Sequence, residues 1–134
     1  MASTFRFELV TPERMIVSED VDEVIAPGYE GEFGVLPEHT YYLAILSIGI
    51  LRYRKGNETK KIAVGGGFAE VDPERIVVMA EVAERAEEID VERAKRAHAR
   101  AEATLKEITI DEDTYRKAHT ALQRAMVRMA AAGD

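Results

Sequence analysis

Six arginines in the last third of the chain have the spacing that most favours chemistry. They are Arg93, Arg96, Arg100, Arg116, Arg124 and Arg128, and they recur at helical intervals. Guanidinium groups on one helical face repel one another unless an anion or carboxylates lie between them. The spacing permits three interpretations: a solvated face with ion pairs such as Glu92 with Arg96, a site for a phosphate-bearing ligand, or a contact with an acidic protein. The pattern alone favours the first.

Catalytic groups of other kinds are sparse. The chain contains no cysteine, which excludes a thiol nucleophile, a disulfide, an iron–sulfur cluster and a thiolate zinc site. Its serines, at positions 3, 18 and 47, stand in no nucleophile-elbow pattern. We therefore expect a chain without catalytic residues.

Glycines and histidines suggest no further site. Residues 65–67 are three consecutive glycines, but the lysine and the following helix of a phosphate loop are missing. We predict a tight turn or a bulge between two strands there. His98 and His119 would lie at similar levels of a helical hairpin, but two imidazoles alone are a poor metal site. We predict no metal site.

The overall charge narrows the classes of function. The net charge is −7 and the isoelectric point about 5.1, which argues against nucleic-acid binding as the main task. No apolar run approaches the roughly 18 residues that cross a bilayer, and no signal peptide is visible at the N-terminus. We expect no nucleic-acid partner and no direct membrane insertion.

Composition divides the chain near residue 84. Residues 1–84 hold 8 Lys and Arg against 15 Asp and Glu, whereas residues 85–134 hold 10 of each. Alanine is concentrated in the second part, with 13 of 19 alanines in residues 83–134. Two compositions indicate two structural regimes. We predict a first domain at 1–84 and a second at 85–134.

The first part has the pattern of short strands. Phe5, Phe7 and Leu9 alternate with charged residues, as in a half-buried strand. Residues 76–79 form a β-branched run, as expected for a strand packed on both sides. Turn signals recur about every ten residues. The pattern predicts a small antiparallel sandwich or barrel of about ten short strands.

The second part has the pattern of two helices. Asp90 is a good N-cap before residues 91–106, which contain no glycine or proline. Residues 107–110 break the pattern, and Asp111 caps a second helix over 112–131. A short connection makes the pair an antiparallel hairpin. The fold class is therefore α+β, mainly β, with the strands first.

The predicted helix seams are built largely from alanine. They consist of Ala94, Ala97, Ala101, Leu105 and Ile108 on the first helix, and Tyr115, Ala118, Leu122, Ala125 and Met129 on the second. Small side chains allow close approach but bury little apolar area, at about 25 cal/mol per Å². We therefore expect a hairpin that is marginal alone, weakly docked on the sandwich and able to change position.

Three segments resemble the epsilon subunit of F-type ATP synthases. Together with the length of the chain and the order of sandwich and then hairpin, they extend the resemblance to essentially the whole chain. They are EGEFGVLPEH at 30–39, GGFAEV at 66–71 and AERAEEIDVERA at 83–94. The chain departs from the family at residues 38–41, where Glu38-His39-Thr40-Tyr41 stands in place of the frequent Gly-His-x-Pro, and at Gly65, where the family often has serine.

The resemblance implies a non-catalytic subunit of the central stalk of the rotor. In such proteins the sandwich binds the gamma subunit and rests on the polar loops of the membrane c-ring. The expected c-ring contacts are Glu30, Gly31, Glu32, Phe33 and His39. It also implies a peripheral location on the cytoplasmic side of the cell membrane and no required cofactor.

The resemblance further implies a regulatory hairpin. In this family the hairpin folds against the sandwich or extends toward the alpha and beta subunits of the catalytic head, where it restrains ATP hydrolysis. Some members bind ATP in the folded form through an Ile/Leu-Asp-x-x-Arg-Ala motif, present here as Ile89, Asp90, Arg93 and Ala94. Further family positions match Glu84, Arg100, Arg124 and Arg128. ATP, with magnesium, is the candidate regulatory ligand, and the alternative is a stand-alone nucleotide-binding regulatory protein.

Overall fold

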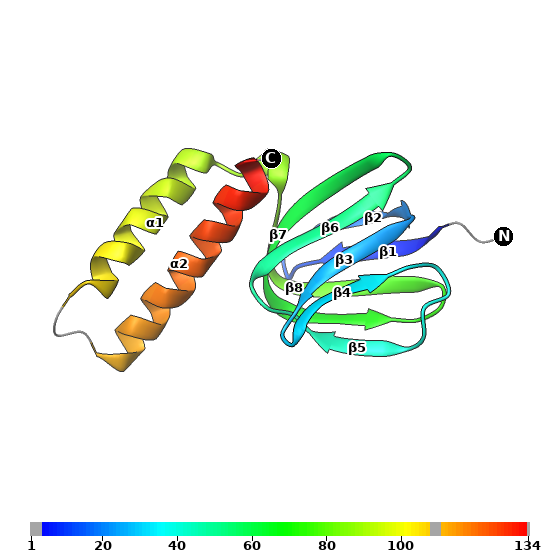
Figure 1. The fold of residues 1–134 in the computed structure, drawn as a ribbon, viewed down its shortest axis with the longest axis horizontal. Helices are drawn as coiled ribbons and strands as arrows, with labels where there is room; N and C mark the ends of the chain where they lie inside the picture. Colours follow the sequence, from blue (N-terminus) through cyan, green and yellow to red (C-terminus); the bar gives the residue numbers. More distant parts are fainter. Residues whose placement is uncertain (1–3, 108–110, 134) are drawn as a thin grey trace.

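The strands come first in the chain and the helices last, as predicted (Figure 1). The computed structural model describes residues 4–107 and 111–133. The strands are β1 (Phe5–Val10), β2 (Met15–Val21), β3 (Glu23–Gly28), β4 (Gly31–Val35), β5 (Tyr42–Ile45), β6 (Gly49–Lys55), β7 (Glu58–Val71) and β8 (Arg75–Arg85). They are followed by the 3-10 turn η1 (Ala86–Glu88) and the helices α1 (Val91–Leu105) and α2 (Glu112–Gly133).

The sheet differs from the prediction in strand number and in direction. The order is β2-β1-β8-β7-β6-β3-β4, with β5 also paired to β7. The described residues form eight strands rather than about ten, because β7 and β8 each run through segments that looked like separate strands. The sheet is also not wholly antiparallel, since β1 pairs with β8 in parallel. Parallel neighbours need a long connection, and the six intervening strands supply it.

The triple glycine is neither a turn nor a bulge between strands, contrary to prediction. Residues 65–67 lie inside β7, where the partner on one side changes from β6 to β5. Pairing with β8 keeps one register through this segment. Gly66 and Gly67 have φ values of 76° and 106°, which favour glycine. A Cβ on Gly67 would collide with the Met79 carbonyl oxygen and lie 2.8 Å from the Cα of Ala80. Glycine is therefore required where the two backbones meet.

The main core lies within the strands and anchors the end of β8. Phe7 and Tyr53 are almost fully buried and meet edge to face, with ring centroids 5.1 Å apart. Arg85 donates from one terminal nitrogen to the Tyr53 hydroxyl at 3.2 Å and from the other to the Ile16 carbonyl at 2.6 Å. The last residue of β8 is thus fixed to the sandwich immediately before the chain leaves it.

The helices begin at the predicted caps. The Asp90 carboxylate accepts the backbone N–H of Arg93 at 3.1 Å. The Asp111 carboxylate accepts the backbone N–H of Thr114 at 2.7 Å and its hydroxyl at 2.9 Å, and these bonds lower the pKa of Asp111. Ile108 of the predicted seam and residues 108–110 of the predicted break lie outside the described residues. The buried residues of both helices are alanines: Ala94, Ala101, Ala118, Ala125 and Ala131.

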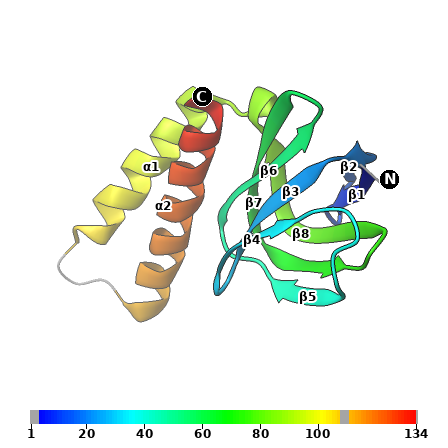
Figure 2. The same ribbon diagram turned by 45° about the vertical axis from the view of Figure 1, so that its right-hand side comes forward.

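The hairpin meets the sandwich through a small cluster separate from the main core. In both views α2 lies between α1 and the strands (Figures 1 and 2). The docking cluster consists of buried Ala63, Ile89 and Ala131, with partly buried Ile50, Val127 and Ala132 around them. Its members are mostly small, so it buries far less apolar area than the core of the sandwich.

Replacing Gly67 with alanine should lower the free energy of unfolding by about 3 kcal/mol or more, because the Cβ meets backbone atoms that cannot move aside. Urea unfolding followed by circular dichroism measures the change. Gly34→Ala is the matched control, since its added Cβ meets no atom within 4 Å and should shift stability by less than about 1 kcal/mol. Equal stability of the two variants would contradict this account of β7.

Candidate functional site

A charged pocket lies where the end of β8 meets both helices. It has a cavity volume of about 230 Å³. The residues that line it are Glu84, Asp90, Arg93, Ala94, Ala97, Arg100 and Arg128. Six of the eight residues predicted for nucleotide binding are therefore brought together. The pocket spans three elements, so it is complete only while the hairpin is docked.

Local geometry explains how the pocket forms. Asp90 ends the extended segment after η1 and caps α1. Residues three and four apart share one face of a helix, so Arg93, Ala97 and Arg100 line the pocket together. The positive N-terminal end of α1 also lies here, because Asp90 is its cap. Ala97 was not predicted; its helical spacing from Arg93 was the available signal.

The arginines of the pocket differ in what they contact. Arg128 donates from Nε to the Glu84 carboxylate at 2.7 Å, and both side chains are about one-third exposed or less. The guanidinium groups of Arg93 and Arg100 make no hydrogen bond or ion pair within residues 4–107 and 111–133. The suggested pair of Glu92 with Arg96 does not form either: Glu92 lies 3.6 Å from the Nζ of Lys95 instead. The pocket thus holds positive charge that the described protein does not neutralise.

Such a pocket can bind a multiply charged anion. Guanidinium groups donate to phosphate oxygens, often in bidentate geometry. Arg93 and Arg100 are exposed, so both are open to a ligand. The carboxylates are already engaged, Glu84 by Arg128 and Asp90 by the backbone of α1. The groups of the pocket that remain free to contact a ligand are therefore mainly hydrogen-bond donors.

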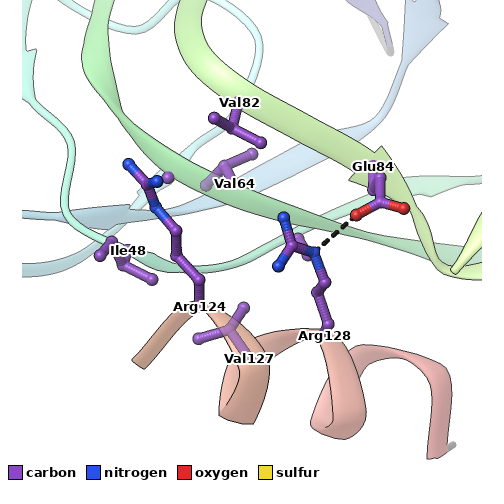
Figure 3. A pocket seen from close by; sticks show the side chains of 9 residues that line it. Ile48, Val64, Val82, Glu84, Arg124, Val127 and Arg128 are labelled. Carbon is purple, nitrogen blue, oxygen red and sulfur yellow. Dashed lines mark hydrogen bonds and ion pairs between the residues drawn. The ribbon is translucent and has the colours of Figure 1, made fainter. Parts of the chain in front are cut away.

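Two residues predicted for the nucleotide site lie outside this pocket. Ile89 is buried in the docking cluster. Arg124 points from α2 toward the strands beside Ile48 and Val64, whereas Arg128 turns to Glu84 (Figure 3). The Nε of Arg124 is buried and has no hydrogen-bond partner in the described protein. Sequence spacing could not separate these roles, because Arg124 and Arg128 are one helical turn apart.

The residues predicted for the c-ring contact lie around β4. Glu30 is exposed in the β3–β4 turn, and Gly31 has a φ of 129°. Glu32 pairs with Arg52 of β6 at 3.1 Å. Both side chains are over one-third exposed, and exposed ion pairs contribute little. The Glu32 carboxylate can therefore exchange Arg52 for a cation on a partner.

Aromatic rings continue this surface. Tyr42 lies between two of the predicted contacts, with its ring centroid 5.3 Å from that of Phe33 and 6.2 Å from that of His39. Sequence analysis missed Tyr42 and Arg52, because cross-strand neighbours depend on a register that local patterns do not reveal.

Further exposed apolar side chains lie on β5 and immediately before it. Tyr41 is 82% exposed, Leu43 66% and Ile45 67%. Ile45 and Phe68 also line a groove of about 520 Å³ between β5, β7 and β8. Exposed large apolar side chains gathered along one edge strand are a candidate interaction site.

The described residues offer neither a metal site nor a membrane-spanning helix. Within residues 4–107 and 111–133, no group of three or more His, Asp and Glu side chains could hold a metal ion. Neither helix, over its described length, is long and apolar enough to cross a membrane.

Comparison with known proteins identifies the family. The protein-family model described as the ATP synthase delta/epsilon chain beta-sandwich domain matches residues 4–86. The one described as the long alpha-helix domain of the same chain matches residues 87–133. The chain is 48% identical to the ATP synthase epsilon chain of Nitratidesulfovibrio vulgaris over 134 residues, 100% of this chain and 99% of the relative. It is 47% identical to that of Geobacter metallireducens over 133 residues, 99% and 96% of the two chains.

Solved structures agree with this assignment. A chain in the cryo-EM structure of Euglena gracilis mitochondrial ATP synthase, OSCP/F1/c-ring, superposes with a TM-score of 0.85 at 28% identity, covering 98% of this chain and 82% of that one. A chain in the Tetrahymena thermophila central stalk/c-ring structure has the same fold, with a TM-score of 0.63 at 14% identity over 96% of both chains. The predicted family is therefore confirmed: the chain belongs to the epsilon-chain family of ATP synthase, whose members are non-catalytic subunits of that complex.

Proposed function

We propose that this chain is a rotor subunit that couples the catalytic head of a proton-translocating ATP synthase to its c-ring. Family membership over the full chain is the observation that carries the proposal. The sandwich contacts the gamma subunit and the polar loops of the c-ring. The subunit is peripheral and lies on the cytoplasmic side of the membrane.

The surface around β4 supports the c-ring contact. Glu30 and Glu32 are exposed there, and the rings of Phe33 and His39 both approach that of Tyr42. A basic loop of the ring would meet opposite charge there, which favours both encounter and orientation. The apolar groove between β5, β7 and β8 suits a more permanent partner, and we assign it to gamma.

We further propose that the hairpin is a nucleotide-responsive regulator. The pocket needs Glu84 from β8, Arg93 from α1 and Arg128 from α2, so a ligand binds the docked form only. A ligand stabilises the form that binds it in proportion to its differential affinity. ATP has the negative charge that the unpaired guanidinium groups require, and it would hold the hairpin down. No cofactor is needed.

The undocked hairpin completes the mechanism. When it extends along gamma, Arg93 and Arg100 leave the pocket and are free to meet acidic segments of the alpha and beta subunits. Such contacts restrain rotation in the direction of hydrolysis. One set of guanidinium groups thus serves a ligand in one state and a protein surface in the other.

Calorimetric titration of the isolated chain with MgATP should show saturable binding. Arg93→Ala should weaken it by about 10- to 100-fold, because a hydrogen bond to a charged group contributes about 1.5–3 kcal/mol. The matched control is Arg116→Ala, which removes an exposed arginine that pairs with Asp113 outside the pocket and should leave the affinity unchanged. Absence of binding up to several millimolar would contradict the regulator while leaving the coupling subunit in place.

Glu32→Lys should weaken coupling in the reconstituted ATP synthase, because it places a cation against the basic loops of the ring. We expect several-fold less ATP-driven proton pumping per ATP hydrolysed, read as quenching of a pH-sensitive dye in vesicles. Glu58→Lys makes the same charge change at the first residue of β7, outside the predicted contact, and should pump normally. Normal pumping by both variants would remove Glu32 from the contact.

Movement of the hairpin can be followed with thiol probes, because the chain contains no cysteine. Ala63 lies in the docking cluster and Ala69 in the main core, and both belong to β7. A cysteine at 63 should react with a thiol reagent at least about tenfold faster than one at 69, since undocking exposes only the first. Saturating ATP should slow the reaction of the cysteine at position 63 with the thiol reagent. Equal rates at the two positions would mean that the hairpin does not move independently.

A further inference from the structure

Arg124 and Arg128 lie one turn apart on α2 yet face different surroundings. Arg128 reaches Glu84 and closes an ion pair at 2.7 Å. Arg124 reaches the sheet and lies against Ile48, Val64, Gly65 and Val82 (Figure 3). The two side chains therefore contribute differently to docking, although their chemistry is the same.

The surroundings of the Arg124 Nε are unfavourable for a polar atom. Its Nε is buried, and it has no partner in the described protein. The cavity beside it measures about 10 Å³, the lower limit for a single water. Val64 is paired on both sides of β7 and Gly65 is paired with Val82 of β8, and within the described residues neither backbone accepts a hydrogen bond from the Arg124 Nε. A buried donor without a partner destabilises the state that buries it.

Gly65 of β7 packs against this side chain. A Cβ at that position would lie 3.5 Å from the Nε of Arg124, with Ile48 and Val82 at 3.9 Å. These are ordinary van der Waals distances, so the guanidinium group is closely packed between α2 and the strands without being crowded by β7. The guanidinium group fits this space by shape, but its Nε lacks a hydrogen-bond partner in the described protein.

We propose that Arg124 is a positioning residue that keeps the docked hairpin marginally stable. Docking is favoured by the small apolar cluster and by the pair of Arg128 with Glu84, and it is opposed by the burial of the Arg124 Nε. Undocking returns that nitrogen to water. The inference rests on the mobile hairpin proposed above, and it gives Arg124 a part in the docking equilibrium rather than in holding the nucleotide.

The test uses the full chain with the cysteine probe at position 63 and no nucleotide. Arg124→Met keeps an unbranched stem and removes the buried nitrogen, so labelling should slow by about tenfold. Arg128→Met is the matched change one turn away, and it should speed labelling because Glu84 loses its partner. The cysteine at position 69 reports whether the sandwich of each variant is folded. An unchanged or faster rate for Arg124→Met would overturn the proposal.

A second measurement separates docking from direct contact with the ligand. Because Arg124→Met raises the docked population, the apparent affinity for MgATP should stay equal or increase. A fall of tenfold or more would show that Arg124 binds the nucleotide, and would overturn the proposal while supporting the pocket. If positions 63 and 69 of the otherwise unchanged chain react at one rate, the mobile hairpin fails first, and this inference fails with it.

Discussion

The contact between hairpin and sandwich depends on small side chains. Ala63, Ile89 and Ala131 are the buried members of the docking cluster, and at about 25 cal/mol per Å² two alanines contribute far less than two leucines would. The ion pair between Glu84 and Arg128 adds a polar tether that is partly exposed and correspondingly weak. The pocket is formed across this contact. The fraction of molecules that have the complete site therefore equals the fraction in which the hairpin is docked.

The positive charge of the pocket at this contact favours the binding of an anion. Arg93, Arg100 and Arg128 of the hairpin line one pocket, to which docking adds the Glu84 carboxylate of β8, and of the three arginines only Arg128 has an ion-pair partner in the described part of the chain. The single Glu84 carboxylate offsets only part of their mutual repulsion, and a bound anion would offset the rest. A polyphosphate would therefore contribute twice, through its own hydrogen bonds and by removing that repulsion. An arginine-rich pocket on a weakly held hairpin is suited to sensing an anion rather than to holding one permanently.

Local sequence signals predicted the parts of the structure that depend on local interactions. The caps at Asp90 and Asp111 and both helices were found, because capping and helical spacing are decided within a few residues. The parallel pairing of β1 with β8 was missed, because it joins segments about seventy residues apart. The continuity of β7 through three glycines was missed for a related reason: β8 holds the strand together. Family motifs located most of the pocket, but the separate orientations of Arg124 and Arg128 depend on packing.

The anchoring of the linker limits where the hairpin can pivot. Arg85 is tied to Tyr53 and Ile16 of the sandwich, and Arg14 donates to Glu88 at 3.2 Å and so lowers the pKa of that carboxyl. The turn η1 is therefore held at both ends. Ile89 follows, buried in the docking cluster, and undocking frees it. In the proposed movement the pivot therefore lies between Glu88 and the first turn of α1, so that the hairpin would move without disturbing the sandwich.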